Sequence, residues 1–304
     1  MRKTLLILGS LVVHTCIWAQ YTLSASNAEY VDQFLHSTLT VKLTGCPQFD
    51  AALQKAIENH WHQTPVIYAT DQATWDAAES TLSFMEIRLV AEEYGVENGI
   101  VKDVYYGWGA QYHDRTYTKE KFNTKSLIAC VGGYCEYPSS GSAEDCDATK
   151  DCSYRIGVTI AQLNEVVDYL KNNSYTGEGW LKLSKYSAAF NRTRDAKTCA
   201  KKPLLVNRKI FNQRVTEEDF REAYQHPLEI VDNDEYRVRI REGDPAYNYL
   251  LVDYSPCMIV SVFDPEQDQT LYLDIIRMFS RSEMMYSRQF NRTLLKDLIK
   301  AVGK

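Results

Sequence analysis

The sequence has 304 residues, of which 45% are hydrophobic and 24% are charged, and its formal net charge is −6. A modest negative charge spread along the chain argues against nucleic-acid binding, which needs clustered Lys and Arg. The length fits two domains of about 100–150 residues each.

Residues 1–20 have the pattern of a secretory signal peptide, with cleavage expected after Ala19 or the residue that follows it. Two basic residues precede an apolar run over residues 5–13, which fits the roughly 7–15 residues of a signal core. A membrane-spanning helix needs about 20 apolar residues. Lipidation of Cys16 is the alternative, but His14 is bulky and polar where a lipoprotein signal carries a small residue. The chain is therefore predicted to be exported: periplasmic, outer-membrane-associated or secreted, without a transmembrane segment in its mature part.

The cysteines agree with an oxidising compartment. Four of them crowd into residues 130–152, at spacings that favour a disulfide-stapled loop over a zinc site and leave the pairing within the loop open. Cys199 and Cys257 follow or precede predicted strands of the second half and are candidates for a further pair, whereas Cys46 is the candidate free thiol. The candidate disulfide cysteines are Cys130, Cys135, Cys146, Cys152, Cys199 and Cys257.

The first half is predicted to begin with a strand at 38–43, followed by a helix that starts at Pro47 and ends before Pro65. Proline suits the first helical position because its missing N–H costs nothing there. Thr159 and Gln162 have the spacing of a capping box that opens a later helix. The other predicted elements are a strand at 66–69, a short helix at 74–79, strands at 82–90, 101–108 and 126–131, and the helix at 159–170.

The second half repeats this order. Thr216 to Asp219 has the form of a capping box, with acidic residues that favour the positive end of a helix. The predicted elements are strands at 204–206, 228–231, 247–254, 258–263 and 270–276, a helix from 216, a short helix at 234–240 and a terminal helix from about 282.

Both halves thus read β-α-β-α-β-β-β-α, and in both an aromatic residue and then a proline end the first helix (Trp61 and Pro65, Tyr224 and Pro227). An internal repeat of this kind fixes an architecture. We predict an α/β fold with mixed sheets in two tandem modules. The predicted parts are an N-terminal module at 21–185 with the cysteine-rich loop at 130–152, a linker at 186–202 and a C-terminal module at 203–304.

The element order of each half resembles the small α/β module at the N-terminus of the TolB protein and in curli-secretion lipoproteins. The stretch CPQFDAALQKAIENHWHQTPVIYAT also looks like one in uncharacterised exported proteins of Bacteroidota-type bacteria. The first resemblance implies a role in envelope scaffolding or partner binding, since such modules are not enzymes; a shared fold does not fix function.

Signatures of catalysis are missing from the sequence. It has no G-x-S-x-G elbow, no dinucleotide fingerprint and no glycine-rich lysine loop for phosphates. His60 and His62 are two residues apart at a helix end, which does not match the spacing of three or four that zinc ligands on one helix face use. His60 is expected to be a packed, hydrogen-bonded side chain. We therefore predict no catalytic residue, no metal and no cofactor.

Aromatic side chains gather in the stretch YYGWGAQYHDRTY. Tyr and Trp combine an apolar face with a polar tip, which suits sugar stacking and protein interfaces. The alternative is that these residues only fill a strand of the core, where Tyr is common. The candidate partner surface consists of Tyr105, Trp108, Tyr112 and Tyr117.

These observations predict an exported, non-enzymatic protein that binds an envelope or secreted protein in a scaffold or assembly role. The first alternative is a binder of small molecules or glycans, which requires a concave aromatic pocket between the two modules. The second is an extracytoplasmic hydrolase, which requires a nucleophile with a base in reach.

Overall fold

The computed structural model describes residues 28–91, 100–112, 127–132, 153–173, 190–254, 257–277 and 290–303. The predicted signal peptide lies outside these residues, as do Tyr117, Cys135, Cys146 and Cys152. The description covers only the backbone of four other candidate residues, which are Tyr105, Trp108, Cys130 and Cys257.

The first module contains a five-stranded mixed sheet with the strand order β2-β1-β3-β4-β5. The first three strands in this order are parallel and the last three are antiparallel. Helices α2 and α3 make the crossovers that parallel neighbours require. The elements are α1 (Ala28–Leu35), β1 (Leu39–Lys42), α2 (Pro47–His60), β2 (Val66–Ala69), α3 (Gln72–Ala77), β3 (Ser80–Ala91), β4 (Ile100–Tyr112), β5 (Leu127–Gly132) and α5 (Ile156–Asn173).

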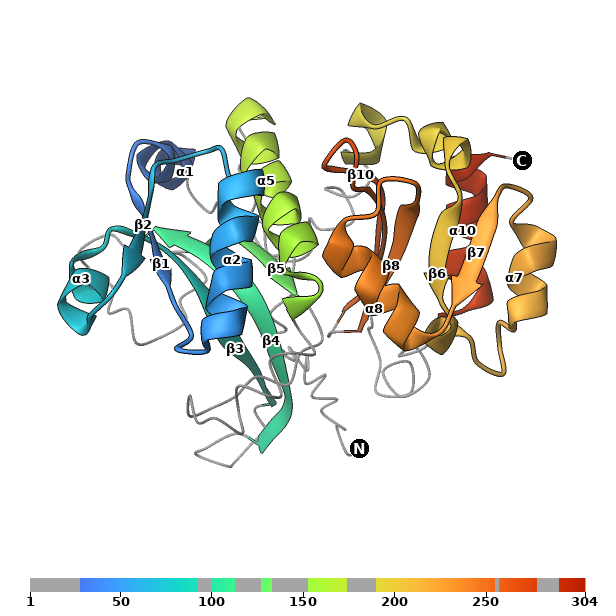
Figure 1. Cartoon of the computed structure of the whole chain (residues 1–304), viewed down its shortest axis with the longest axis horizontal. Helices are drawn as coiled ribbons and strands as arrows, with labels where there is room; N and C mark the ends of the chain where they lie inside the picture. The colour runs from blue at the N-terminus through green and yellow to red at the C-terminus, as the bar shows by residue number, and fades with distance from the viewer. Residues whose placement is uncertain are drawn as a thin grey trace, which may run out of the picture.

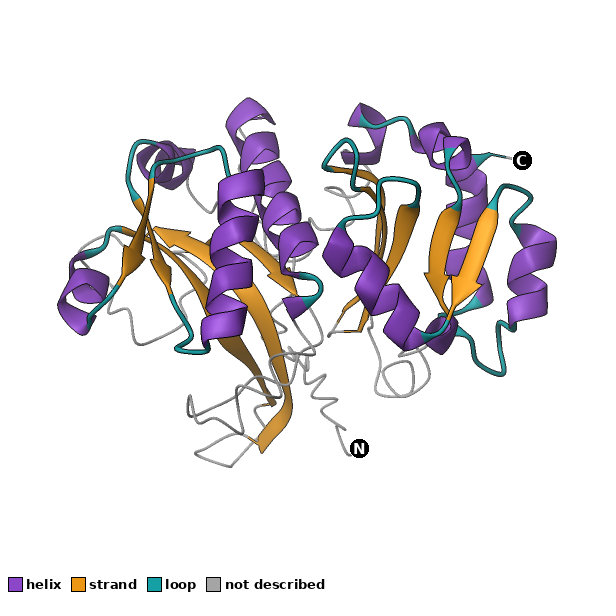
Figure 2. Ribbon diagram, in the orientation of Figure 1, coloured by secondary structure: helices purple, strands orange, loops and turns teal. Residues whose placement is uncertain are grey.

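The second module repeats this sheet, with β6, β7, β8, β9 and β10 in the places of β1 to β5 and the same parallel and antiparallel neighbours. Figures 1 and 2 show the two sheets side by side, each with its own helices. The predicted α/β fold in two modules is therefore confirmed. The elements are β6 (Leu204–Asn207), α7 (Glu217–Ala223), β7 (Leu228–Val231), α8 (Asn233–Glu242), β8 (Asn248–Tyr254), β9 (Cys257–Asp264), β10 (Gln269–Arg277) and α10 (Arg292–Val302), with short 3-10 helices at η2 (Ala196–Lys201) and η3 (Arg208–Ile210).

Local sequence signals explain the starts of two helices and fail at a third. Pro47 is the first residue of α2, and the capping box of α7 forms as predicted, since the Thr216 side chain accepts from the Asp219 backbone N–H and Asp219 accepts from the Thr216 N–H. The capping box predicted at Thr159 is wrong. Helix α5 begins at Ile156, and the Thr159 N–H donates to the Arg155 carbonyl at 3.0 Å inside the first turn.

Two predictions about cysteines are wrong. Cys199, a candidate to pair with Cys257, is a free thiol. It is fully buried in the core of the second module on the short helix η2, and burial raises its pKa to about 12. Cys46, the expected free thiol, is disulfide-bonded and buried at the start of α2.

The predicted linker at 186–202 is not a detached segment where the structure describes it. Phe190 is buried in the core of the first module, and Cys199 is buried in the core of the second. Between them, the Asn191 side chain donates to the carbonyl of Leu273 and accepts from its N–H, at 2.7 and 2.9 Å. This segment therefore ties both modules to each other.

Helix α5 is buried on two sides. One side belongs to the core of the first module, beside α2, and carries Ile156, Ile160, Leu163, Val166, Val167 and Leu170. Its other side packs against the sheet of the second module, next to α8, as Figure 1 shows. This second cluster contains Val158, Ala161, Leu205, Tyr249 and Phe263. Apolar residues on two faces of the helix account for this enclosure.

Polar side chains also cross the junction of the modules. The Arg155 guanidinium donates two hydrogen bonds to the Asp253 carboxylate, one of them at 2.6 Å, and the two side chains are only 12% and 3% exposed. The buried Gln162 amide donates to the Ser261 hydroxyl at 3.3 Å.

Among the described residues, no helix is long and apolar enough to cross a membrane.

We expect the Arg155→Met substitution to lower the free energy of unfolding by about 3–5 kcal/mol, because it leaves the Asp253 carboxylate buried without its partner. Urea denaturation measures this loss. The double variant Arg155→Met, Asp253→Leu should recover most of it. Arg208→Met, which removes an exposed partner of Glu217, is the control and should cost about 0–1 kcal/mol. A loss below that control's would show that the buried pair does not hold the modules together.

Candidate functional site

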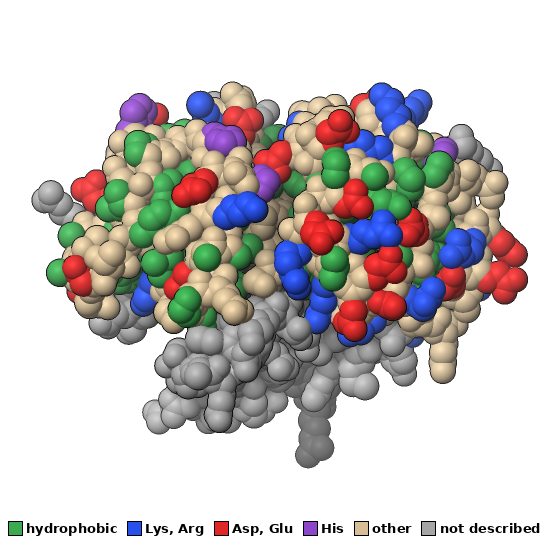
Figure 3. Space-filling view, in the orientation of Figure 1, with side chains coloured by type: hydrophobic (Ala, Val, Ile, Leu, Met, Phe, Trp, Pro, Cys, Tyr) green, Lys and Arg blue, Asp and Glu red, His purple; other side chains and the backbone are tan. Residues whose placement is uncertain are grey.

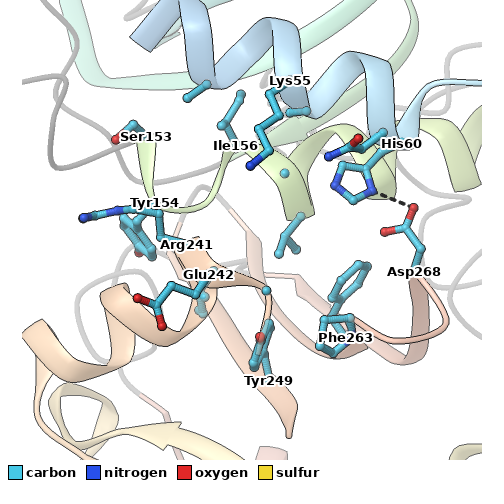
Figure 4. A pocket seen from close by; sticks show the side chains of 18 residues that line it. Lys55, His60, Ser153, Tyr154, Ile156, Arg241, Glu242, Tyr249, Phe263 and Asp268 are labelled. Atoms are coloured by element: carbon cyan, nitrogen blue, oxygen red, sulfur yellow. Dashed lines mark hydrogen bonds and ion pairs between the residues drawn. The ribbon is translucent and has the colours of Figure 1, made fainter. Parts of the chain in front are cut away.

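A pocket of about 430 Å³ lies at the junction of the two modules. Ligand pockets typically measure about 300–1,000 Å³. The second half of α2, the first turn of α5, the last turn of α8 and the turn between β9 and β10 surround it, as Figure 4 shows. Its polar and aromatic lining includes Lys55, His60, Tyr154, Glu242, Phe263 and Asp268.

Aromatic rings from both modules form part of the wall. Tyr154 comes from the first module, and Tyr249 and Phe263 come from adjacent strands of the second. Tyr249 is fully buried, and its hydroxyl donates to the carbonyls of Arg239 and Asp244, at 3.2 and 2.9 Å. These contacts fix the ring, so the aromatic wall is preformed.

His60 and Asp268 pair across the junction although they are 208 residues apart in the sequence. The distance from His60 Nδ1 to Asp268 Oδ2 is 2.8 Å, and the two side chains are 26% and 34% exposed. Asp268 adopts a left-handed backbone conformation with φ of 52°, which Asp tolerates better than most residues. Its second oxygen, Oδ1, is buried and has no hydrogen-bond partner among the described residues.

Gly157 in the first turn of α5 lies beside the His60 ring. A Cβ atom at this position would lie 3.4 Å from His60 Nε2, at the close limit of van der Waals contact. The first-turn N–H groups of a helix have no acceptor within that helix. The imidazole therefore lies against the positive end of α5, while its other nitrogen faces Asp268.

Charged side chains line the pocket. In Figure 4, Lys55 extends from α2 toward the pocket, and Glu242 and Asp268 lie on opposite sides of it. Arg241 precedes Glu242 at the end of α8. Figure 3 shows that acidic and basic side chains are interspersed over the second module, whereas the visible face of the first carries fewer. The pocket thus combines both signs of charge.

Glu165 on α5 lies close behind this site. Both of its carboxylate oxygens accept from the Thr270 N–H, at 2.9 and 3.0 Å, and Arg194 donates to Oε1 at 3.1 Å. Burial raises the pKa of Glu165 to about 7, and the negative charge of Asp268 adds to this, while the hydrogen bonds and Arg194 oppose it. Asp268 and Glu165 thus lie near enough at the junction for the charge of one to affect the other.

The structure describes the side chain of only one residue of the predicted partner surface. Tyr112 is half-buried, packs against the core of the first module, and its ring centroid lies 5.9 Å from that of Tyr30. It does not line the pocket. A partner surface formed by Tyr105, Trp108 and Tyr117 stays a prediction.

The expectation that His60 is hydrogen-bonded is confirmed by its contact with Asp268. Within the described residues, no group of three or more His, Cys, Asp or Glu side chains is placed to hold a metal ion. Sequence reasoning missed Lys55, Glu242 and Asp268, because isolated charged residues in three distant segments carry no motif.

Comparison with known proteins finds no matching family model, no similar curated protein and no similar solved structure.

We expect the stability of the protein to fall as the pH rises from about 5 to 8, and Glu165→Gln to reduce this fall by about 2–4 kcal/mol. The reason is that the folded protein holds a proton on Glu165 up to a pKa of about 7, whereas the ordinary value is 4.5. Between these values the folded state binds more protons than the unfolded state, so raising the pH removes stability.

Urea denaturation at the two pH values measures this difference. Glu222→Gln, which changes an exposed carboxylate, is the matched control and should leave the pH dependence as it is. An unchanged pH dependence in the Glu165 variant would mean that Arg194 and Thr270 keep this carboxylate ionised.

Proposed function

We propose that this protein is an exported, non-enzymatic binding protein that holds a small molecule in the pocket between its two modules. The pocket itself carries the proposal: a concave site of about 430 Å³ with aromatic walls and a few polar groups is the form that small-molecule sites take. A glycan is included in this class, since flat aromatic faces also stack on sugars.

The construction of the junction supports this proposal. The walls come from both modules, and the buried pair of Arg155 and Asp253 and the two-sided packing of α5 hold the modules together. A pocket in such a frame needs no large rearrangement to receive a ligand, and preformed sites lose less entropy on binding.

The hypothesis of a protein partner has less support. Its candidate surface depends on exposed aromatic rings, and Tyr112, the one ring of the four that the structure describes, packs on the core instead. Export of the chain rests on the signal-peptide pattern of residues 1–20 and remains part of the proposal.

The Asn59→Trp substitution tests the pocket. Asn59 is exposed on α2 and lines the pocket, so an indole at this position should fill the cavity without disturbing the core. We expect a fragment library, screened by ligand-observed NMR, to yield binders of the wild-type protein that Asn59→Trp no longer binds. Saturating binders should stabilise the wild type against heat, by about 2.7 kcal/mol at a concentration of 100 Kd.

Glu58→Trp is the matched control, because Glu58 is the exposed neighbour on the same helix and does not line the pocket. It should bind the same fragments as the wild type. The proposal fails if the library gives no binders, or if both tryptophan variants bind them equally well.

A further inference from the structure

Three charged side chains at the pocket are exposed and have no partner among the described residues. Among the residues that the structure describes, none forms an ion pair or hydrogen bond with Lys55, Arg241 or Glu242. Elsewhere in the second module, comparable side chains do form pairs: Arg239 contacts Glu229 and Glu235, and Lys202 contacts Asp264. The pocket is thus lined by charged side chains of both signs that form no ion pair within the described part of the protein.

Asp268 adds a carboxylate to this set. Its side chain lines the pocket and is 34% exposed. Because its Oδ1 is closed to solvent, the oxygen that a ligand can reach is Oδ2, which lies 2.8 Å from His60 Nδ1. A carboxylate oxygen has two lone pairs, so Oδ2 can accept from a ligand as well as from His60.

The positive groups lie on other parts of the wall. The Lys55 ammonium points from α2 into the pocket in Figure 4, with Asp268 to one side of it. The first turn of α5, which also lines the pocket, adds the positive end of a helix dipole. An anionic group beside Lys55 and a cationic group at Asp268 would therefore be favoured at the same time.

We propose that the pocket takes a dipolar ligand that carries both a carboxylate and an ammonium group, of the class of short peptides with free ends. This inference rests on the proposed function and names its ligand class. Lys55 binds the carboxylate, Asp268 accepts from the ammonium group, and the rings of Tyr154 and Phe263 contact the apolar part of the ligand. A volume of about 430 Å³, toward the lower end of the range for ligand pockets, suits a molecule of the size of a dipeptide.

Three forms of one dipeptide test this proposal by isothermal titration calorimetry. The probes are leucyl-phenylalanine, its N-acetyl derivative, which lacks the ammonium group, and its C-terminal amide, which lacks the carboxylate. We expect the free dipeptide to bind and each blocked form to bind at least about tenfold more weakly, because each has lost one charge-assisted contact.

Two substitutions assign the contacts. Lys55→Met should make the free dipeptide and the amide bind equally, and Asp268→Asn should make the free dipeptide and the N-acetyl form bind equally. Asn keeps the shape of Asp, can still accept from His60 and tolerates the left-handed backbone. Lys171→Met and Asp168→Asn, which change the same charges at exposed positions of α5 that do not line the pocket, should bind all three probes as the wild type does.

The dipolar class is wrong if the blocked forms bind as well as the free dipeptide, or if none of the three binds. The fragment screen separates this outcome from failure of the proposed function. Fragments that are lost in Asn59→Trp while the dipeptide fails to bind would overturn only the ligand class, whereas failure of both experiments would remove the pocket as a binding site.

Discussion

The burial of α5 on two sides is the contact on which the rest of the structure depends. One side of the helix completes the core of the first module, and the other packs on the sheet of the second, where Val158 and Ala161 contact the cluster of Leu205, Tyr249 and Phe263. Without this helix, both modules would expose large apolar surfaces to water, which folded proteins avoid. The two modules are therefore one structural unit, although each has a sheet of its own.

The candidate site follows from the same contact. Helix α5 begins at the junction of the two modules. Its first turn encloses a space there together with the end of α2, the end of α8 and the β9–β10 turn, and apolar side chains do not fill this space. Some polar groups at this boundary pair with groups of the opposite module, as Arg155 does with Asp253 and His60 with Asp268. Lys55, Arg241 and Glu242, which have no such partner among the described residues, line the pocket.

The spacing of apolar residues and the positions of prolines in the sequence predict most of the fold. The strands at 66–69 and 228–231 have the bounds predicted for them, because each follows a proline that ends a helical pattern and consists largely of residues that favour strands. The sequence pattern did not predict helix α1. It placed the start of α5 too late, because the capping-box spacing at Thr159 occurs inside a helix whose first turn has no signal of its own.

The candidate site was much harder to predict. Its charged residues come from positions 55, 241, 242 and 268, and only the packing of two modules against one helix brings them together. His60 was singled out and correctly expected to be hydrogen-bonded, but nothing in the sequence indicates that its partner is Asp268. The fate of the thiols of Cys46 and Cys199 likewise depends on distances in space and not on spacing along the chain.

The two-sided packing of α5 also has a kinetic consequence. Binding proteins whose two lobes swing about a hinge must close before they hold a ligand, and this step slows association. Here the lobes are joined by a shared helix, a buried ion pair and the segment from Phe190 to Cys199, so the pocket has its final shape before any ligand arrives. Association should then proceed in a single step at a rate set by diffusion and orientation. Differences in affinity between related ligands should appear in how long each one stays.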